Sequence, residues 1–131
     1  MGLPIKGKEI SGSNYEWYRF EEKGQWLIGA YYRSEKTDWN CKRHLIALID
    51  SDKGIKGEFR WVLGNTILDK ILPELKPYEI IGIEYQGEKR SNNSKRKYKH
   101  FIVSKYTDDV IIKHYGKEAL EKVKNTDETP F

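Results

Sequence analysis

The sequence predicts a mainly β fold, and three observations favour that class. Five segments are rich in β-branched and aromatic residues and are bounded by turn residues. One short amphipathic segment separates the third of them from the fourth. A second stretch of helical periodicity follows the fifth. The five predicted strands are residues 25–34, 43–50, 57–63, 79–86 and 97–106.

The first two predicted strands differ in how they should sit in a sheet. The first carries Gly29 in its middle, where an interior glycine often marks a sharp bend. We therefore expect this strand to pair in both halves of a closing sheet. The second is apolar on both faces, which predicts a central strand. Residues 15–20 alternate enough to form a short additional strand before them.

A short helix is predicted between the third and fourth strands. Asn65 offers a side-chain oxygen to the free amides of its first turn. Pro73 should shorten the helix, and Pro77 should end it. Its apolar face, which we expect to close one end of a curved sheet, consists of Ile67, Leu68, Ile71, Leu72 and Leu75.

The chain after residue 106 changes character. Residues 108–124 have apolar residues at helical spacing, and Gly116 allows two short helices in place of one. Residues 125–131 show no periodicity. The predicted organisation is a β domain over residues 1–106, a helical extension over 107–124 and an acidic-aromatic tail over 125–131.

The order of the predicted elements, three strands, a helix and two strands, is that of a five-stranded OB-fold barrel. Such barrels often hold single-stranded nucleic acid or oligosaccharide. A chain of 131 residues is long enough to bury one core without disulfides. The sequence therefore predicts one OB-fold domain with a C-terminal helical extension.

Charge is unevenly distributed along the chain. The whole chain has a formal net charge of +4. Residues 107–131 hold four lysines against six acids, a net of −2, so the remaining residues carry +6. A basic body is typical of a polyanion binder, although a lysine-rich soluble surface would have the same composition.

Compartment and redox state follow from a few residues. The single cysteine, Cys41, cannot form an internal disulfide, which favours a reducing cytoplasm, or the host cytoplasm if the protein is viral. No apolar run approaches the ~18 residues that a membrane span needs. Residues 1–9 lack the apolar core of a secretory signal. We expect a soluble protein without a membrane partner.

The segment joining the last two predicted strands, residues 87–98, is strongly basic. It contains five lysines and arginines and one acid, with serines and asparagines that can donate to phosphate oxygens. In nucleic-acid-binding OB barrels this loop clasps the ligand. A solvated hairpin tip is the alternative. The predicted phosphate contacts are Lys89, Arg90, Lys95, Arg96 and Lys97.

Aromatic residues next to positive charge are the second feature of a nucleic-acid surface. Bases stack on exposed rings at roughly 1–3 kcal/mol each, without regard to sequence. Any single ring could instead pack in the core. The candidate rings are Tyr32, Trp39, Trp61 and Tyr98, and the neighbouring cations Arg43 and Arg60 are weaker candidates for the same groove.

Residues 72–106 resemble OB-fold single-stranded-DNA-binding proteins of phage and bacterial type. The likeness lies in Lys76-Pro77-Tyr78-Glu79, in Ile81-x-Ile83-x-Tyr85-x-Gly87, and in Tyr98-x-x-Phe101-x-Val103 after the basic loop. It covers about a quarter of the chain closely and the rest only by element order. The resemblance implies sequence-independent binding of single-stranded DNA in replication, recombination or repair, with a homo-oligomer as a further expectation.

The chain end is similar to the acidic tip with which bacterial single-strand-binding proteins recruit replication and repair partners. The resemblance assigns partner binding to Asp127, Glu128, Pro130 and Phe131. This tip has only two acids, and a helical segment stands where the family has a long linker. A free carboxylate beside an apolar ring can be captured by backbone amides and arginine.

Other functions are less well supported. Asp38, Cys41 and His44 could be drawn as three metal ligands, but no fourth ligand follows in spacing. No phosphate-binding glycine loop, nucleophile elbow or HExxH occurs. We expect no enzymatic activity, cofactor or metal. An RNA-binding OB module and a protein-interaction domain of a virus or mobile element remain as alternatives.

Overall fold

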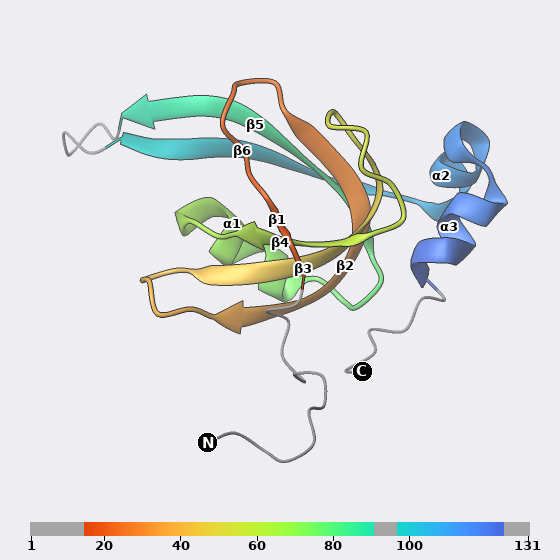
Figure 1. The fold of residues 1–131 in the computed structure, drawn as a ribbon, viewed down its shortest axis with the longest axis horizontal. Helices are drawn as coiled ribbons and strands as arrows, with labels where there is room; N and C mark the ends of the chain where they lie inside the picture. The colour runs from red at the N-terminus through yellow and green to blue at the C-terminus, as the bar shows by residue number, and fades with distance from the viewer. Residues whose placement is uncertain (1–14, 91–96, 125–131) are drawn as a thin grey trace, which may run out of the picture.

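The computed structural model describes residues 15–90 and 97–124. They form one curved sheet with helices on both sides of it (Figure 1). The strands are β1 (Trp17–Tyr18), β2 (Trp26–Lys36), β3 (Lys42–Ser51), β4 (Phe59–Leu63), β5 (Ile80–Arg90) and β6 (Lys97–Tyr106). The helices are α1 (Thr66–Ile71), which continues into a 3-10 turn (Leu72–Glu74), α2 (Asp108–Tyr115) and α3 (Lys117–Lys124).

The sheet has the order β1-β4-β3-β2-β5-β6, and the prediction of a mainly β fold is confirmed. β2 pairs antiparallel with both β3 and β5, as the position of Gly29 predicted. The pairing with β3 shifts register between Ile28 and Gly29. A Cβ at Gly29 would lie 2.4 Å from the carbonyl oxygen of Ala47, so only glycine allows this close approach.

The predicted short strand in residues 15–20 is confirmed as β1, which pairs in parallel with β4 and brings the sheet of the described residues to six strands. One difference from the predicted barrel is clear. The sheet does not close into a barrel: β1 and β6 are its edges. Hydrogen bonds join the two sides near the opening: the Asn65 side-chain amide donates to the carbonyl of Lys99 at 2.7 Å, and the Lys99 ammonium donates to the carbonyl of Phe20 at 2.8 Å.

The two long hairpins project in the same direction, with α1 between them, and α2 and α3 lie at the other end of the molecule (Figure 1). The β5–β6 hairpin is longer than predicted. Gly87 has a positive φ of 88°, and a register shift after Tyr85 accommodates it. Pairing then resumes and runs to Arg90, so Lys89 and Arg90 belong to a strand and not to a loop.

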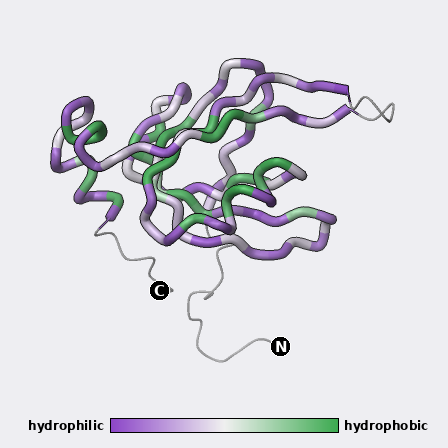
Figure 2. The backbone as a smooth tube through the Cα atoms, turned by 180° about the vertical axis from the view of Figure 1, so that it is seen from behind, coloured by the Kyte–Doolittle hydropathy of each residue, from purple (hydrophilic) through white to green (hydrophobic). Residues whose placement is uncertain are grey.

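Apolar residues form two clusters, one on each face of the sheet. The first lies inside the curve, where α1 contributes Leu68 and the strands contribute residues such as Leu48 and Ile83. The second lies on the outer face, where Ile111 of α2 and Leu120 and Val123 of α3 belong to the same cluster as strand residues such as Tyr32 and Ile49. Figure 2 shows hydrophobic colour where the strands meet and hydrophilic colour toward the ends of both hairpins.

Caps and turns define the helices as the sequence predicted. The Asn65 side chain accepts from the backbone amides of Ile67 and Leu68 at 3.0 and 2.9 Å. Gly116, with a φ of 92°, separates α2 from α3. No helix among the described residues has the length and apolar character that crossing a membrane requires.

Tyr78 occupies a turn position that normally requires glycine. Its φ is 71°, and the Glu79 amide donates to the Lys76 carbonyl at 3.2 Å, so Pro77 and Tyr78 are the central residues of a type II turn. A left-handed conformation costs an L-residue about 1–2 kcal/mol. The ring gains an edge-on contact with Tyr32, at 5.0 Å between centroids, but stays 44% exposed.

We therefore expect Tyr78→Gly to be more stable than Tyr78→Ala by about 1 kcal/mol, because both variants lose the ring and only glycine relieves the backbone. Urea denaturation of the two variants measures the difference. Equal stability, or a more stable alanine variant, would show that this turn carries no strain.

Candidate nucleic-acid interface

Two of the four predicted stacking rings are buried. Trp61 is 0% exposed and Tyr32 is 9% exposed. The guanidinium of Arg43 lies 4.0 Å from the Trp61 ring centroid, and the Tyr32 hydroxyl donates to the carbonyl of Val123 at 2.7 Å. Neither ring presents a face to a base, so the prediction that they stack on nucleic acid is wrong in this fold. The helical extension explains Tyr32, because α3 covers its side of the sheet.

Two of the predicted cations, Arg43 and Arg60, form ion pairs within the protein. Arg43 donates to the carboxylate of Glu35 at 2.7 and 3.2 Å while it stacks on Trp61. Arg60 lies 2.8 Å from Glu58 and 3.3 Å from Glu16. Their side chains are only 18% and 13% exposed. The weaker candidates for phosphate contact are therefore structural ion pairs.

Trp39 has the opposite environment. It lies in the turn between β2 and β3 and is 61% exposed. The Thr37 hydroxyl accepts from the Trp39 amide at 3.1 Å and lies 2.7 Å from the Cys41 carbonyl, to which it can donate. These bonds fix the turn, so the ring is held outward at little further entropic cost. Trp39 is therefore a candidate ring that is exposed in the structure.

Trp39 borders a cleft of about 300 Å³ at the open side of the sheet. Trp17 of β1 lies beside it, with 6.4 Å between ring centroids and 58° between ring planes. Leu63, at the end of β4, is 44% exposed on the same cleft. The lining comprises Trp17, Tyr18, Arg19, Phe20, Glu21, Trp39, Leu63, Gly64, Asn65, Lys99 and Phe101.

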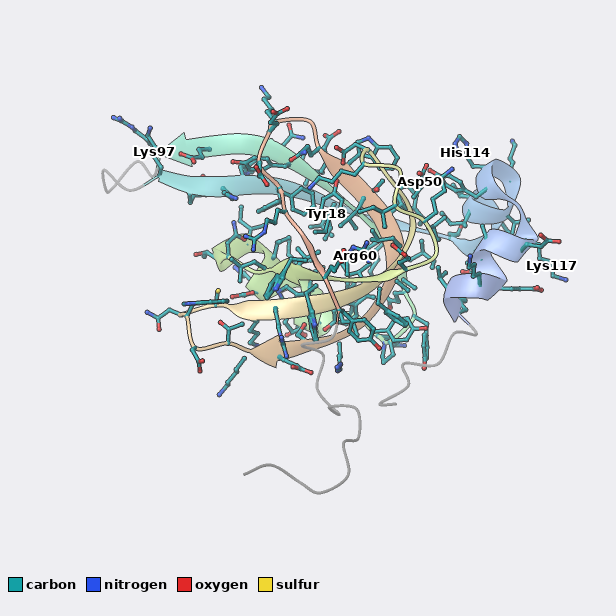
Figure 3. All side chains as sticks on the ribbon, viewed as in Figure 1. Tyr18, Asp50, Arg60, Lys97, His114 and Lys117 are labelled. Atoms are coloured by element: carbon teal, nitrogen blue, oxygen red, sulfur yellow. The ribbon has the colours of Figure 1, made fainter. Side chains whose placement is uncertain are left out.

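The cleft continues onto one face of the β5–β6 hairpin. Lys97, Lys99 and Phe101 alternate along β6 and therefore share a face, and Arg90 is paired with Lys97. One acid, Glu88, is paired with Lys99. Figure 3 shows Lys97 near the end of the hairpin, far from Lys117 on α3. We call the combination of the cleft and this hairpin face the cleft surface.

The remaining candidates divide between the other face and the undescribed residues. Tyr98 is 37% exposed but points to the opposite face of β6 from Lys99, and Lys89 is paired with it. The predicted contacts Lys95 and Arg96 lie outside the described residues, as do Asp127, Glu128, Pro130 and Phe131. Of the predicted set, Trp39 lines the cleft, and Arg90 and Lys97 lie on the hairpin face that continues from it.

A buried polar chain supports the wall of the cleft. His44 is 0% exposed, with Nδ1 2.7 Å from Ser34 Oγ and Nε2 2.8 Å from Asp69 Oδ1. Tyr31 Oη lies 2.5 Å from the same Ser34 oxygen. Asp69 also accepts from the backbone amide of Lys42 at 2.9 Å. The chain thus ties α1 to β2 and β3.

The proton positions in this chain of hydrogen bonds follow from the groups at its two ends, the Asp69 carboxylate and the Tyr31 hydroxyl. A carboxylate only accepts, so His44 Nε2 carries a hydrogen and the neutral ring accepts at Nδ1 from Ser34. Burial raises the pKa of Tyr31, whose hydroxyl then donates to Ser34. Burial also lowers the pKa of His44 below 6.5, and this effect outweighs that of the hydrogen bond that His44 donates to Asp69.

His44 is therefore not free to bind a metal. Within residues 15–90 and 97–124 no three His, Cys, Asp or Glu side chains are grouped so that they could hold an ion. Ser34, His44 and Asp69 have the composition of a hydrolytic triad. The polar groups of these three side chains are instead hydrogen-bonded to one another and to Tyr31, so a structural role explains the arrangement.

Sequence reasoning missed Trp17, Arg19, Leu63 and Lys99, which all line the cleft. Trp17 and Arg19 belong to the predicted short additional strand, whose alternation does not indicate which strand it pairs with. Leu63 follows the alternation of a core strand and gives no sign that the sheet opens beside it. Only Lys99, next to Tyr98, had a local signal of the expected kind.

No protein-family model, curated protein or solved structure matches the chain.

Proposed function

We propose that the protein binds single-stranded DNA with little sequence preference, on the cleft surface. The observation that carries this proposal is the 61% exposed ring of Trp39, held outward by its turn over a cleft that leads onto Arg90 and Lys97. Exposed indole rings seldom serve a monomer's stability, whereas nucleobases stack on them favourably.

The sheet supports an OB-type interpretation of the fold. Without β1, its order is β4-β3-β2-β5-β6, with α1 between β4 and β5. This is the strand order of an OB barrel that has been opened between its third and fifth strands. In this interpretation the Trp39 turn and the β5–β6 hairpin are the two connections that flank the ligand.

The proposed division of labour follows from the chemistry of the side chains. Trp39 and Trp17 offer π faces to bases, and Leu63 offers apolar contact. Arg19, Arg90 and Lys97 are exposed cations that can neutralise phosphates, and each contact releases condensed counterions. None of these contacts requires a particular base, so binding should be largely independent of sequence.

Trp39→Ala should weaken binding of oligo-deoxythymidine by about 1–3 kcal/mol, the value of one stacked base, which corresponds to roughly fivefold to 150-fold in Kd. Tyr98→Ala is the control, because Tyr98 is an exposed ring on the other face of the same hairpin. Tryptophan fluorescence quenching at two salt concentrations measures both. An equal effect of the two variants would remove the cleft from the proposal, and the absence of salt-dependent binding would refute the function.

The alternatives are separated by the same titration. Stacking and phosphate contacts do not depend on the sugar, so the same features would fit an RNA-binding module. Competition between matched DNA and RNA oligonucleotides distinguishes the two. A protein-interaction domain should bind neither. Roles in replication, recombination or repair, partner recruitment by residues 127–131, a cytoplasmic location and a homo-oligomeric state remain sequence-based predictions.

A further inference from the structure

The polar side chains of the cleft are almost all hydrogen-bond donors. Indole nitrogens, guanidinium and ammonium groups donate and do not accept. Among the lining residues these groups belong to Trp17, Arg19, Trp39 and Lys99. The carboxylate of Glu21 is the acceptor on the same lining. A ligand that enters the cleft therefore meets an excess of N–H groups.

Asn65 adds a donor whose orientation is fixed. Its side-chain oxygen is occupied by the amides of Ile67 and Leu68, so the amide cannot flip. One hydrogen of its Nδ2 is donated to the carbonyl of Lys99 at 2.7 Å. An amide nitrogen has two hydrogens, so one remains available on the cleft side. Helix capping thus determines which group Asn65 presents.

Lys99 lines the same cleft and is also anchored. Its ammonium donates to the carbonyl of Phe20 at 2.8 Å, which holds the side chain against the opening of the sheet. Two of its three hydrogens remain for other acceptors. Asn65 and Lys99 together form a fixed donor pair at the edge of an apolar, ring-lined cleft.

We propose that this donor pair reads the carbonyl edge of one unstacked base, so that the cleft prefers thymine, uracil or guanine to cytosine or adenine. This inference rests on the proposed function, and it adds a modest base preference to binding that is otherwise independent of sequence. Thymine and guanine present carbonyl oxygens where cytosine and adenine present amino groups. An amino group of the base is itself a donor. If it faced the donor pair, the Asn65 amide, the Lys99 ammonium and the base amino group would all lack an acceptor, and such unmade hydrogen bonds are costly.

The sharpest comparison uses oligo-deoxyuridine and oligo-deoxycytidine of about ten nucleotides, within the usual site size of such proteins. Uracil and cytosine have the same size and differ at position 4, where one has an oxygen and the other an amino group. We expect deoxyuridine to bind about tenfold more tightly at equal salt, measured by tryptophan quenching.

Asn65→Ser tests the assignment. Serine is also a good N-cap, so α1 keeps its first-turn bonds while the amide donor is lost. The preference for deoxyuridine should fall to about twofold, with a smaller change in affinity for deoxycytidine. The control is Asn40→Ser, which changes an exposed asparagine of the Trp39 turn that does not line the cleft. It should leave the preference unchanged.

The outcomes separate this inference from the function on which it rests. Equal, salt-dependent binding of both oligomers by the wild type would overturn the base preference and leave DNA binding intact. A preference that survives Asn65→Ser unchanged would overturn the role of Asn65. If neither oligomer quenches the fluorescence, the proposed function itself fails.

Discussion

Replacing Arg19, Arg90 and Lys97 together with glutamine should flatten the dependence of log affinity on log salt by about two units. Each phosphate contact on a single strand contributes roughly 0.7 to that slope through counterion release. All three side chains are exposed cations on the cleft surface. Glutamine removes the charge and keeps a flexible polar side chain, and all three positions are exposed, so the fold should be unaffected.

The matched control removes three exposed lysines elsewhere, Lys56, Lys113 and Lys117. The net charge changes by the same amount, but α2 and α3 lie at the opposite end from the two hairpins (Figure 1). The slope of this control should stay within about half a unit of the wild type. Equal flattening in both triple variants would mean that DNA responds only to the overall charge, and the cleft surface would lose its assignment.

The second large effect concerns the buried chain of Tyr31, Ser34, His44 and Asp69. Asp69→Ala should destabilise the protein by about 1–3 kcal/mol, because it leaves the buried Nε2 hydrogen of His44 without a partner. The Lys42 amide loses its acceptor in the same variant. Urea denaturation at pH 7 measures the loss. Asp108→Ala, which removes an exposed salt bridge to Lys124, is the control and should cost less than about 1 kcal/mol.

His44 also predicts the direction of a pH effect. Its pKa in the folded protein is below 6.5 because the ring is buried. As the pH falls below 6.5, His44 is protonated in the unfolded chain but stays neutral in the folded protein. The free energy of unfolding therefore decreases until the pH passes the pKa of His44 in the folded protein. The slope contributed by one such proton is at most about 1.4 kcal/mol per pH unit.

We therefore expect the wild type to lose stability between about pH 7 and pH 5 more steeply than a His44→Gln variant, which lacks the titrating ring. His114→Gln serves as the control, because His114 is exposed on α2. Identical pH dependence in the wild type and the His44 variant would show that His44 does not titrate differently on folding.

Much of the fold could be predicted because local patterns dictate it. Alternation of apolar residues gave five strands within a few residues of their observed bounds, and Asn65 and Gly116 placed the ends of helices. The extension of β5 to Arg90 could not be predicted. It depends on a bulge at Gly87 that returns the strands to register, which is a property of the pair and not of either strand.

The candidate site was predicted less well, since a ring's role depends on what covers it. Trp39 and Trp61 both stand near positive charge in the sequence. Trp39 lies in a turn and is 61% exposed, whereas the guanidinium groups of Arg33 and Arg43 lie over the Trp61 ring, which is buried. Neighbouring residues in the sequence contain no information about that cover, because it comes from arginines of the other strands, Arg33 of β2 and Arg43 of β3.

The sequence by itself determined the class of the fold, the alternation of its strands and the glycine that lets β2 pair on both sides, because these depend on short-range sterics and periodicity. Only the tertiary structure decided that the sheet stays open and that Trp17, Leu63 and Lys99 line the opening. It also decided that Arg43 and Arg60 are neutralised by acids. These outcomes depend on distances between distant parts of the chain, which packing sets and a linear pattern does not contain.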